Sequence, residues 1–139
     1  MSPISRDQAI ARADAMLESV FADYPKHLES TFAEMATLAA AENWEALHVA
    51  AHDLKGQAET CGWPIIGLIA RSLDAAFKTG NSAHFTDAAK VHLDCMRLCL
   101  RSSIQSPNPE MDKFLGELDD LVGRMTQNAQ MAKVTAKGA

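Results

Sequence analysis

The sequence predicts an all-α protein that folds as one domain. Alanine, leucine and methionine supply most of the 47% hydrophobic residues, and aromatic residues make up only 6%, a composition that favours packed helices over strands. Apolar residues recur at three- and four-residue spacing along most of the chain, as in amphipathic helices. A chain of 139 residues can bury one adequate core, so we expect a single helical domain over residues 1–126.

The first predicted helix covers residues 4–22. Its apolar stripe consists of Ile10, Ala13, Leu17, Val20 and Phe21. Pro25 removes a backbone donor and disfavours helical geometry at Tyr24, which predicts a break or kink. A second helix then carries the stripe onward through Leu28, Phe32, Met35 and Leu38.

The third and fourth helices are separated by a compact turn. Asn43 can cap a third helix that begins near Trp44. Gly62 tolerates the left-handed position that ends a helix, and Pro64 suits the first turn of the next one. The fourth helix is predicted to run to about Thr79 and to bury Ile66, Ile69, Leu73 and Phe77.

Two more helices are expected. The fifth extends from about residue 83 to 104, with core contacts at Phe85, Ala88, Val91, Met96 and Cys99. A proline-rich breaker precedes the sixth, at residues 109–126, whose apolar stripe must cover the bundle, pair with a second copy or bind a partner. Of these we favour packing within the chain. The aperiodic residues 127–139 are predicted to be disordered.

The third helix carries the residues that indicate a function. Helical geometry places His52, Lys55 and Gly56 opposite its apolar side, so the histidine faces water. An accessible imidazole nitrogen can act as a nucleophile. Lys55, one turn on, can offset the negative charge of a phosphoryl group on His52. Gly56 costs the helix about 1 kcal/mol relative to alanine, which indicates that another protein approaches there.

The pattern His52-x-x-Lys55-Gly56, followed by Gly62, resembles the signature of the histidine phosphotransfer (Hpt) domains of bacterial phosphorelays. The resemblance covers about residues 42–78 and implies that His52 is the phosphoacceptor. It further implies that Lys55 supports the phosphoryl group electrostatically and that Gly56 is a gap that admits a receiver domain.

The same resemblance implies an antiparallel four-helix bundle as the core, at about residues 25–104, with 4–22 and 109–126 as extra helices. The sequence departs from the family at one place. Family members often carry glutamine twenty-two residues after the histidine, where this chain has Asp74. An acid there cannot donate a hydrogen bond to a phosphoryl oxygen.

A docking surface for the receiver follows from the short connection between the third and fourth helices. The two should form an antiparallel hairpin, which brings the polar face of the fourth helix near His52. Gly62 and Pro64 are the structural turn residues. The expected docking residues are Gly56, His48, Glu59, Arg71 and Lys78.

Two histidine patterns could bind a metal, but we assign no metal site. His48 and His52 are spaced i, i+4, yet no carboxylate or thiolate completes a ligand set on that helix. His92, Cys95 and Cys99 share one side of the fifth helix but lack a visible fourth ligand, and buried cysteines at core spacing are common. We therefore interpret them as core residues.

Composition and missing motifs narrow the function further. The net charge of −5 and the pI near 5.4 argue against a nucleic-acid surface. No run of about 18 apolar residues and no leader segment is present, so neither the membrane nor secretion is expected and the cytoplasm is the default. No glycine-rich phosphate loop is found, which argues against an ATP-dependent enzyme.

The sequence therefore predicts a phosphocarrier and not an enzyme. His52 would accept a phosphoryl group from an aspartyl phosphate of a receiver domain, in a hybrid histidine kinase or a response regulator, and relay it to another response regulator. No cofactor is expected on this chain, since the receiver is expected to supply magnesium. The protein would be a monomer or a homodimer. The alternative is a non-phosphorylated adaptor or dimerisation module that acts through the stripe of the sixth helix.

Overall fold

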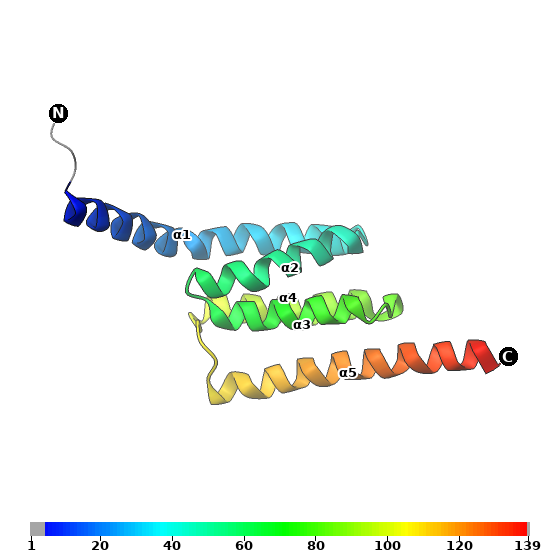
Figure 1. The fold of residues 1–139 in the computed structure, drawn as a ribbon. Coiled ribbons are helices and arrows are strands. Elements are labelled where there is room, and N and C mark those ends of the chain that lie inside the picture. Colours follow the sequence, from blue (N-terminus) through cyan, green and yellow to red (C-terminus); the bar gives the residue numbers. More distant parts are fainter. Residues whose placement is uncertain (1–4, 139) are drawn as a thin grey trace.

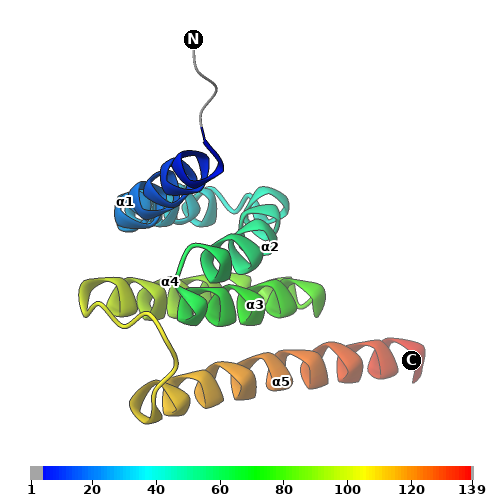
Figure 2. The same ribbon diagram turned by 60° about the vertical axis from the view of Figure 1, so that its left-hand side comes forward.

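The computed structural model describes the backbone of residues 5–138 and the side chains of residues 5–131. Its α-helices are α1 (Arg6–Ala40), α2 (Trp44–Thr60), α3 (Pro64–Lys78), α4 (Phe85–Arg101) and α5 (Pro109–Gly138), and a short 3-10 helix, η1 (Ser82–His84), precedes α4. The described residues contain no strand. Successive helices run in opposite directions, and α5 lies along α3 and α4 (Figures 1 and 2). The all-α prediction is confirmed.

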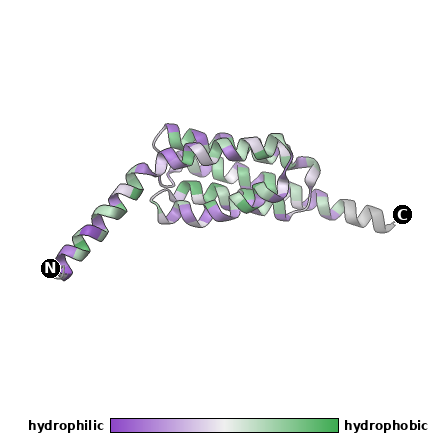
Figure 3. Ribbon diagram, turned by 90° about the horizontal axis from the view of Figure 1, so that it is seen from above, coloured by the Kyte–Doolittle hydropathy of each residue, from purple (hydrophilic) through white to green (hydrophobic). Residues whose placement is uncertain are grey.

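Of the break or kink predicted near Pro25, the break is wrong, because α1 runs through the proline as one helix. The apolar stripe keeps the same helical phase on both sides, so Tyr24 and Leu28 pack on the same core although one backbone hydrogen bond is lost. The helix is nevertheless bent, with its N-terminal part inclined to the rest (Figure 3). A capping box at Ser5 and Gln8 starts α1, and the predicted start at residue 4 lies outside the described residues.

The N-terminal part of α1 projects from the bundle instead of packing on it (Figure 3). Every residue from 5 to 23 is exposed, including the predicted stripe, in which Leu17 is 53% exposed. The α1 residues in the core begin only at Tyr24 and continue with Leu28, Phe32 and Met35. The helix therefore extends beyond the four-helix core that its second half helps to build.

The cap at the start of α2 and the turn between α2 and α3 form as the sequence predicts. The side chain of Asn43 accepts a hydrogen bond from the Ala46 backbone at the start of α2. After α2, Gly62 adopts a φ of 89°, in the left-handed region, and Pro64 is the first residue of α3. All four predicted core residues of α3 are buried.

In α4 the core prediction for Val91 is wrong, since Val91 is 45% exposed and His92 and Leu93 are buried beside it.

The apolar stripe of α5 packs inside the molecule. Met111, Leu118 and Met125 are buried against α3 and α4. The predicted end of this helix at 126 is wrong, and so is the disorder expected for 127–138, because α5 continues to Gly138. Residues 127–137 contain no proline or glycine, so nothing local stops the helix. Residue 139 lies outside the described residues. No described helix is both long and apolar enough to cross a membrane.

Gly67 sets the distance between α2 and α3. A Cβ atom at this position would lie 2.9 Å from the backbone oxygen of Lys55, closer than real Cβ atoms approach. A side chain on α3 would therefore push α2 away at the level of Lys55. Gly56, in contrast, has open space where a Cβ would stand.

We expect Gly67→Ala to destabilise the fold by about 1–3 kcal/mol, because the backbone oxygen that it meets cannot rotate aside. Gly56→Ala is the matched control, and it should be neutral or stabilising by up to about 1 kcal/mol through helix propensity alone. Urea denaturation of both variants measures the difference. Equal stabilities would contradict the assigned role of Gly67.

Candidate functional site

A buried carboxylate forms the centre of the polar cluster between α2 and α3. Asp74 of α3 is 2% exposed. Its Oδ1 accepts a hydrogen bond from Nε2 of His48 at 2.7 Å, and its Oδ2 accepts from Nζ of Lys55 at 3.1 Å and Nζ of Lys78 at 3.0 Å. His52 completes the cluster, with its Nδ1 3.7 Å from Oδ1.

Helical spacing explains why these side chains meet. His48, His52 and Lys55 follow one another by about one turn along one face of α2. Asp74 and Lys78 are one turn apart on α3, and α2 and α3 pack closely along their length. The face that carries the predicted phosphoacceptor is therefore also the face that covers Asp74.

Asp74 is held in its charged form by its neighbours. Burial raises the pKa of the carboxyl group, but hydrogen bonds from Lys78, Lys55 and His48 outweigh that effect and lower its pKa to about 2. The carboxylate is ionised at neutral pH and compensates much of the positive charge of the two lysines. The cluster thus combines two cations, one anion and two imidazoles within hydrogen-bonding distance or just beyond it.

His52 is the accessible member of the cluster. Its side chain is 60% exposed, and Nδ1 is the ring nitrogen that approaches Asp74. The side chain of Lys55 is 28% exposed, whereas that of Lys78 is 61% exposed.

Aromatic side chains pack against His48. The ring of His48 lies 5.5 Å from that of Phe77. Phe77 packs edge-on against Phe85 and also contacts Trp44. This aromatic wall keeps His48 half-buried and directs its Nε2 at the carboxylate.

The remaining predicted site residues surround the cluster without joining it. Gly56 is exposed and faces open space. Glu59 and Arg71 are exposed, and among the described side chains neither makes an ion pair or a side-chain hydrogen bond. Gly62 and Pro64 shape the turn at the far end of α2.

His92, Cys95 and Cys99 are buried in the core. Nδ1 of His92 donates to the Ala88 carbonyl at 2.6 Å, and Nε2 accepts from the Ser72 hydroxyl at 2.9 Å. Burial lowers the pKa of His92, which favours the neutral ring that this pairing requires. Within the described part of the chain, no group of three or more histidine, cysteine or acidic side chains is placed to hold a metal ion.

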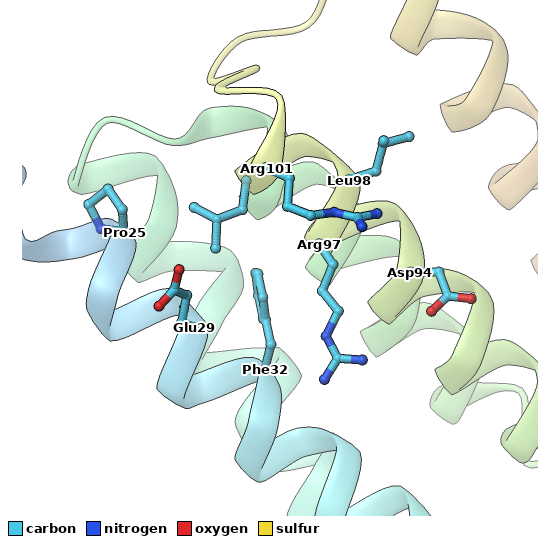
Figure 4. A pocket seen from close by; sticks show the side chains of 8 residues that line it. Pro25, Glu29, Phe32, Asp94, Arg97, Leu98 and Arg101 are labelled. Carbon is cyan, nitrogen blue, oxygen red and sulfur yellow. The ribbon is translucent and has the colours of Figure 1, made fainter.

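An open groove of about 800 Å³ lies elsewhere, between α1 and α4 (Figure 4). Phe32 and Leu98 contribute apolar surface, and Glu29, Arg97 and Arg101 bring charges to it. None of the predicted site residues lines it. The groove is therefore separate from the cluster around Asp74.

Comparison with known proteins identifies the family of the chain. The model of the Hpt domain family matches residues 15–106, which span the bent helix α1 from residue 15, all of α2, α3 and α4, and every residue of the Asp74 cluster. The chain belongs to the Hpt domain family. The family assignment made from the sequence is confirmed. No curated protein and no solved structure matches the chain.

Membership gives the class of activity. Hpt domains are histidine phosphotransfer modules of phosphorelays, carry phosphoryl groups instead of catalysing reactions as enzymes, and interact with receiver domains of response regulators. In this Hpt domain the match ends before α5. The helix that covers α3 and α4 is thus outside the matched family core.

Sequence reasoning missed three residues at this site. It placed Asp74 near His52 but did not make it a site residue, since helical periodicity cannot show that one polar residue is buried. Gly67 gave no signal of its contact with α2. Val49, which is 57% exposed one turn before His52, could have been found as an apolar residue on a polar helix face.

The lowered pKa of Asp74 predicts a pH dependence of stability. Because its pKa in the folded chain lies below the ordinary 3.8, the ionised carboxylate stabilises the fold above about pH 4, and this contribution is lost as the pH falls toward 2. The stability difference between the wild type and Asp74→Asn should thus shrink by about 2 kcal/mol over that range.

Urea denaturation at a series of pH values measures this difference. Asp53→Asn is the control, because Asp53 is exposed and lies beside His52 without an ion pair. A difference for Asp74→Asn that stays constant with pH would show that the carboxylate is not stabilised in its ionised form.

Proposed function

We propose that this Hpt domain accepts a phosphoryl group on His52 from the aspartyl phosphate of a receiver domain and relays it to another response regulator. The observation that carries the proposal is the position of His52. It lies inside the family match, is more than half exposed, and stands beside two lysines. No other histidine of the described chain combines these features.

The chemistry assigns a role to each ring nitrogen. Nδ1 faces the Asp74 carboxylate, so a proton on Nδ1 is electrostatically favoured there. Nε2 then carries the free electron pair and points away from Asp74, where a receiver can reach it. We assign Nε2 as the nitrogen that attacks phosphorus.

Lys55 and Lys78 supply the positive charge that a phosphoryl group requires. A phosphoryl group brings about two negative charges near neutral pH. Both lysines contact Oδ2 of Asp74, the carboxylate whose Oδ1 lies 3.7 Å from Nδ1 of His52, so their charge lies close to the ring. The magnesium ion and the acidic pocket for this chemistry belong to the receiver in this proposal.

The exposed face of α2 provides the docking surface. Gly56 leaves open space one turn after His52, and Val49 exposes an apolar side chain one turn before it. Glu59 and Arg71 add charged groups at its edge. The competing adaptor function was assigned to the stripe of α5, but that stripe packs against α3 and α4, so the structure favours the surface on α2.

Transfer of label tests the phosphoacceptor. We expect the wild type to take acid-labile, base-stable label from a phosphorylated receiver domain or an active hybrid kinase, and His52→Gln to take none, because amide nitrogen is not a nucleophile. His84→Gln, which alters another exposed histidine, is the control and should label normally. Absence of label on the wild type, or equal label on His52→Gln, would reject the carrier function.

A bulky residue at Gly56 should block docking while sparing the fold. Because nothing lies within 4 Å of the position of its Cβ, Gly56→Leu fits the domain but fills the space that a receiver would enter. We expect the rate of phosphoryl transfer from a receiver to fall at least about ten-fold, equivalent to about 1.4 kcal/mol.

The matched control is Gly116→Leu, because Gly116 is also exposed with open space around it but lies on α5. Time courses of phosphoryl transfer, with both variants at equal concentrations of the same receiver, measure the change in rate. Equal rates for the wild type and Gly56→Leu would remove Gly56 from the docking surface.

A further inference from the structure

Asp74 is the only buried acid among the described side chains. It pairs with both lysines of the cluster, Lys55 and Lys78, and also accepts a hydrogen bond from His48. The arrangement also places its negative charge close to the His52 ring, with Oδ1 of Asp74 3.7 Å from Nδ1.

We propose that Asp74 is a positioning residue that makes the phosphohistidine of this domain labile, so that the phosphoryl group is passed on quickly instead of being stored. The inference rests on the proposed function of His52. It goes beyond that function because it assigns to Asp74 the control of how long the phosphorylated form lasts.

The first support is the contact of Asp74 with the ring. When Nε2 of His52 attacks, the new N–P bond forms, and the acyl P–O bond breaks with its electron pair on the receiver's carboxylate. The ring then carries positive charge and keeps its proton on Nδ1, 3.7 Å from Oδ1 of Asp74. A nearby carboxylate stabilises that cation and holds the proton there.

That proton decides how easily the phosphoryl group departs. In the onward step the P–N bond breaks, its electron pair returns to Nε2, and phosphorus bonds to a carboxylate oxygen of the next receiver. With Nδ1 protonated, the ring leaves as neutral imidazole, which is a better leaving group than an imidazolate anion. Asp74 therefore favours departure.

The second support is competition for the lysines. With Asp74 ionised, a phosphoryl group on His52 raises the negative charge of the cluster to about three, and the two lysines and the protonated ring must balance it. Any ammonium group that moves to the phosphoryl oxygens leaves Asp74 less well paired. A neutral amide at this position would release both lysines and could itself donate a hydrogen bond.

The test compares the wild type with Asp74→Asn and Asp74→Gln. Each is phosphorylated on His52 by a phosphorylated receiver domain or, where that is slow, by phosphoramidate, a small phosphoryl donor. After removal of the donor, loss of the phosphohistidine ³¹P signal is followed at neutral pH. We expect a half-life about ten-fold longer in both variants, and an unchanged half-life in the Asp53→Asn control.

A second readout separates positioning from a merely structural role. In the unphosphorylated protein, ¹⁵N shifts of the His52 ring should show the Nδ1–H tautomer in the wild type and a shift toward the Nε2–H tautomer in Asp74→Asn. The Lys78 side chain is largely exposed, so Lys78→Gln should disturb folding least. This variant should shorten the half-life of the phosphohistidine, because it removes a cation while Asp74 remains.

The outcomes distinguish the two proposals. If the wild type carries label on His52 but all half-lives are equal, or the Asp74 variants decay faster, the role of Asp74 is overturned and the carrier function stands. Identical tautomers in the wild type and Asp74→Asn overturn it independently of phosphorylation. If the wild type takes no label on His52 from either donor, the carrier function fails and the inference fails with it.

Discussion

The close contact between α2 and α3 is the constraint on which the site depends. Because Gly67 has no side chain, the backbones of α2 and α3 approach so closely at the level of Lys55 that even a Cβ atom would not fit between them. At that distance Asp74 lies beneath His48, His52 and Lys55 instead of facing solvent beside them. A wider spacing would let water reach the carboxylate, and its attraction to the cations would weaken as the local dielectric rose.

Asp74 can be buried in its ionised form only because both of its carboxylate oxygens have hydrogen-bond donors. An unpaired ionised carboxylate in a protein interior costs far more free energy than a domain of this size has available. Here three donors satisfy it, and no buried side-chain polar atom in the described residues lacks a partner. Since the donors come from two helices, the ion cluster also favours one register of α2 against α3 over others, as buried polar groups do in coiled coils.

Periodicity and turn chemistry were sufficient to predict most of the fold. Local sequence patterns predicted the apolar stripes of α2 and α3, the cap at Asn43 and the turn at Gly62, and the structure contains each of them. The errors arose where tertiary context decides. Pro25 was read as a break or kink, but Tyr24 and Leu28 on either side of it pack on the same core, and α1 stays one helix. For the site, the sequence predicted which side of α2 carries His52, but not that Asp74 would be buried beneath it, because burial depends on how closely two helices approach.

The arrangement of the helices also explains why the site is on α2. α1 and α3 pack on the inner sides of α2, whereas α5 covers α3 and α4. The outer face of α2 is left open, and it carries Val49, His52 and Gly56. A carrier needs one nucleophile that a second protein can reach while its proton and counter-charges stay ordered. An uncovered helix above a buried carboxylate meets both requirements. The His52 ring is exposed to a partner, and the buried Asp74 carboxylate keeps the proton and the lysines in fixed positions.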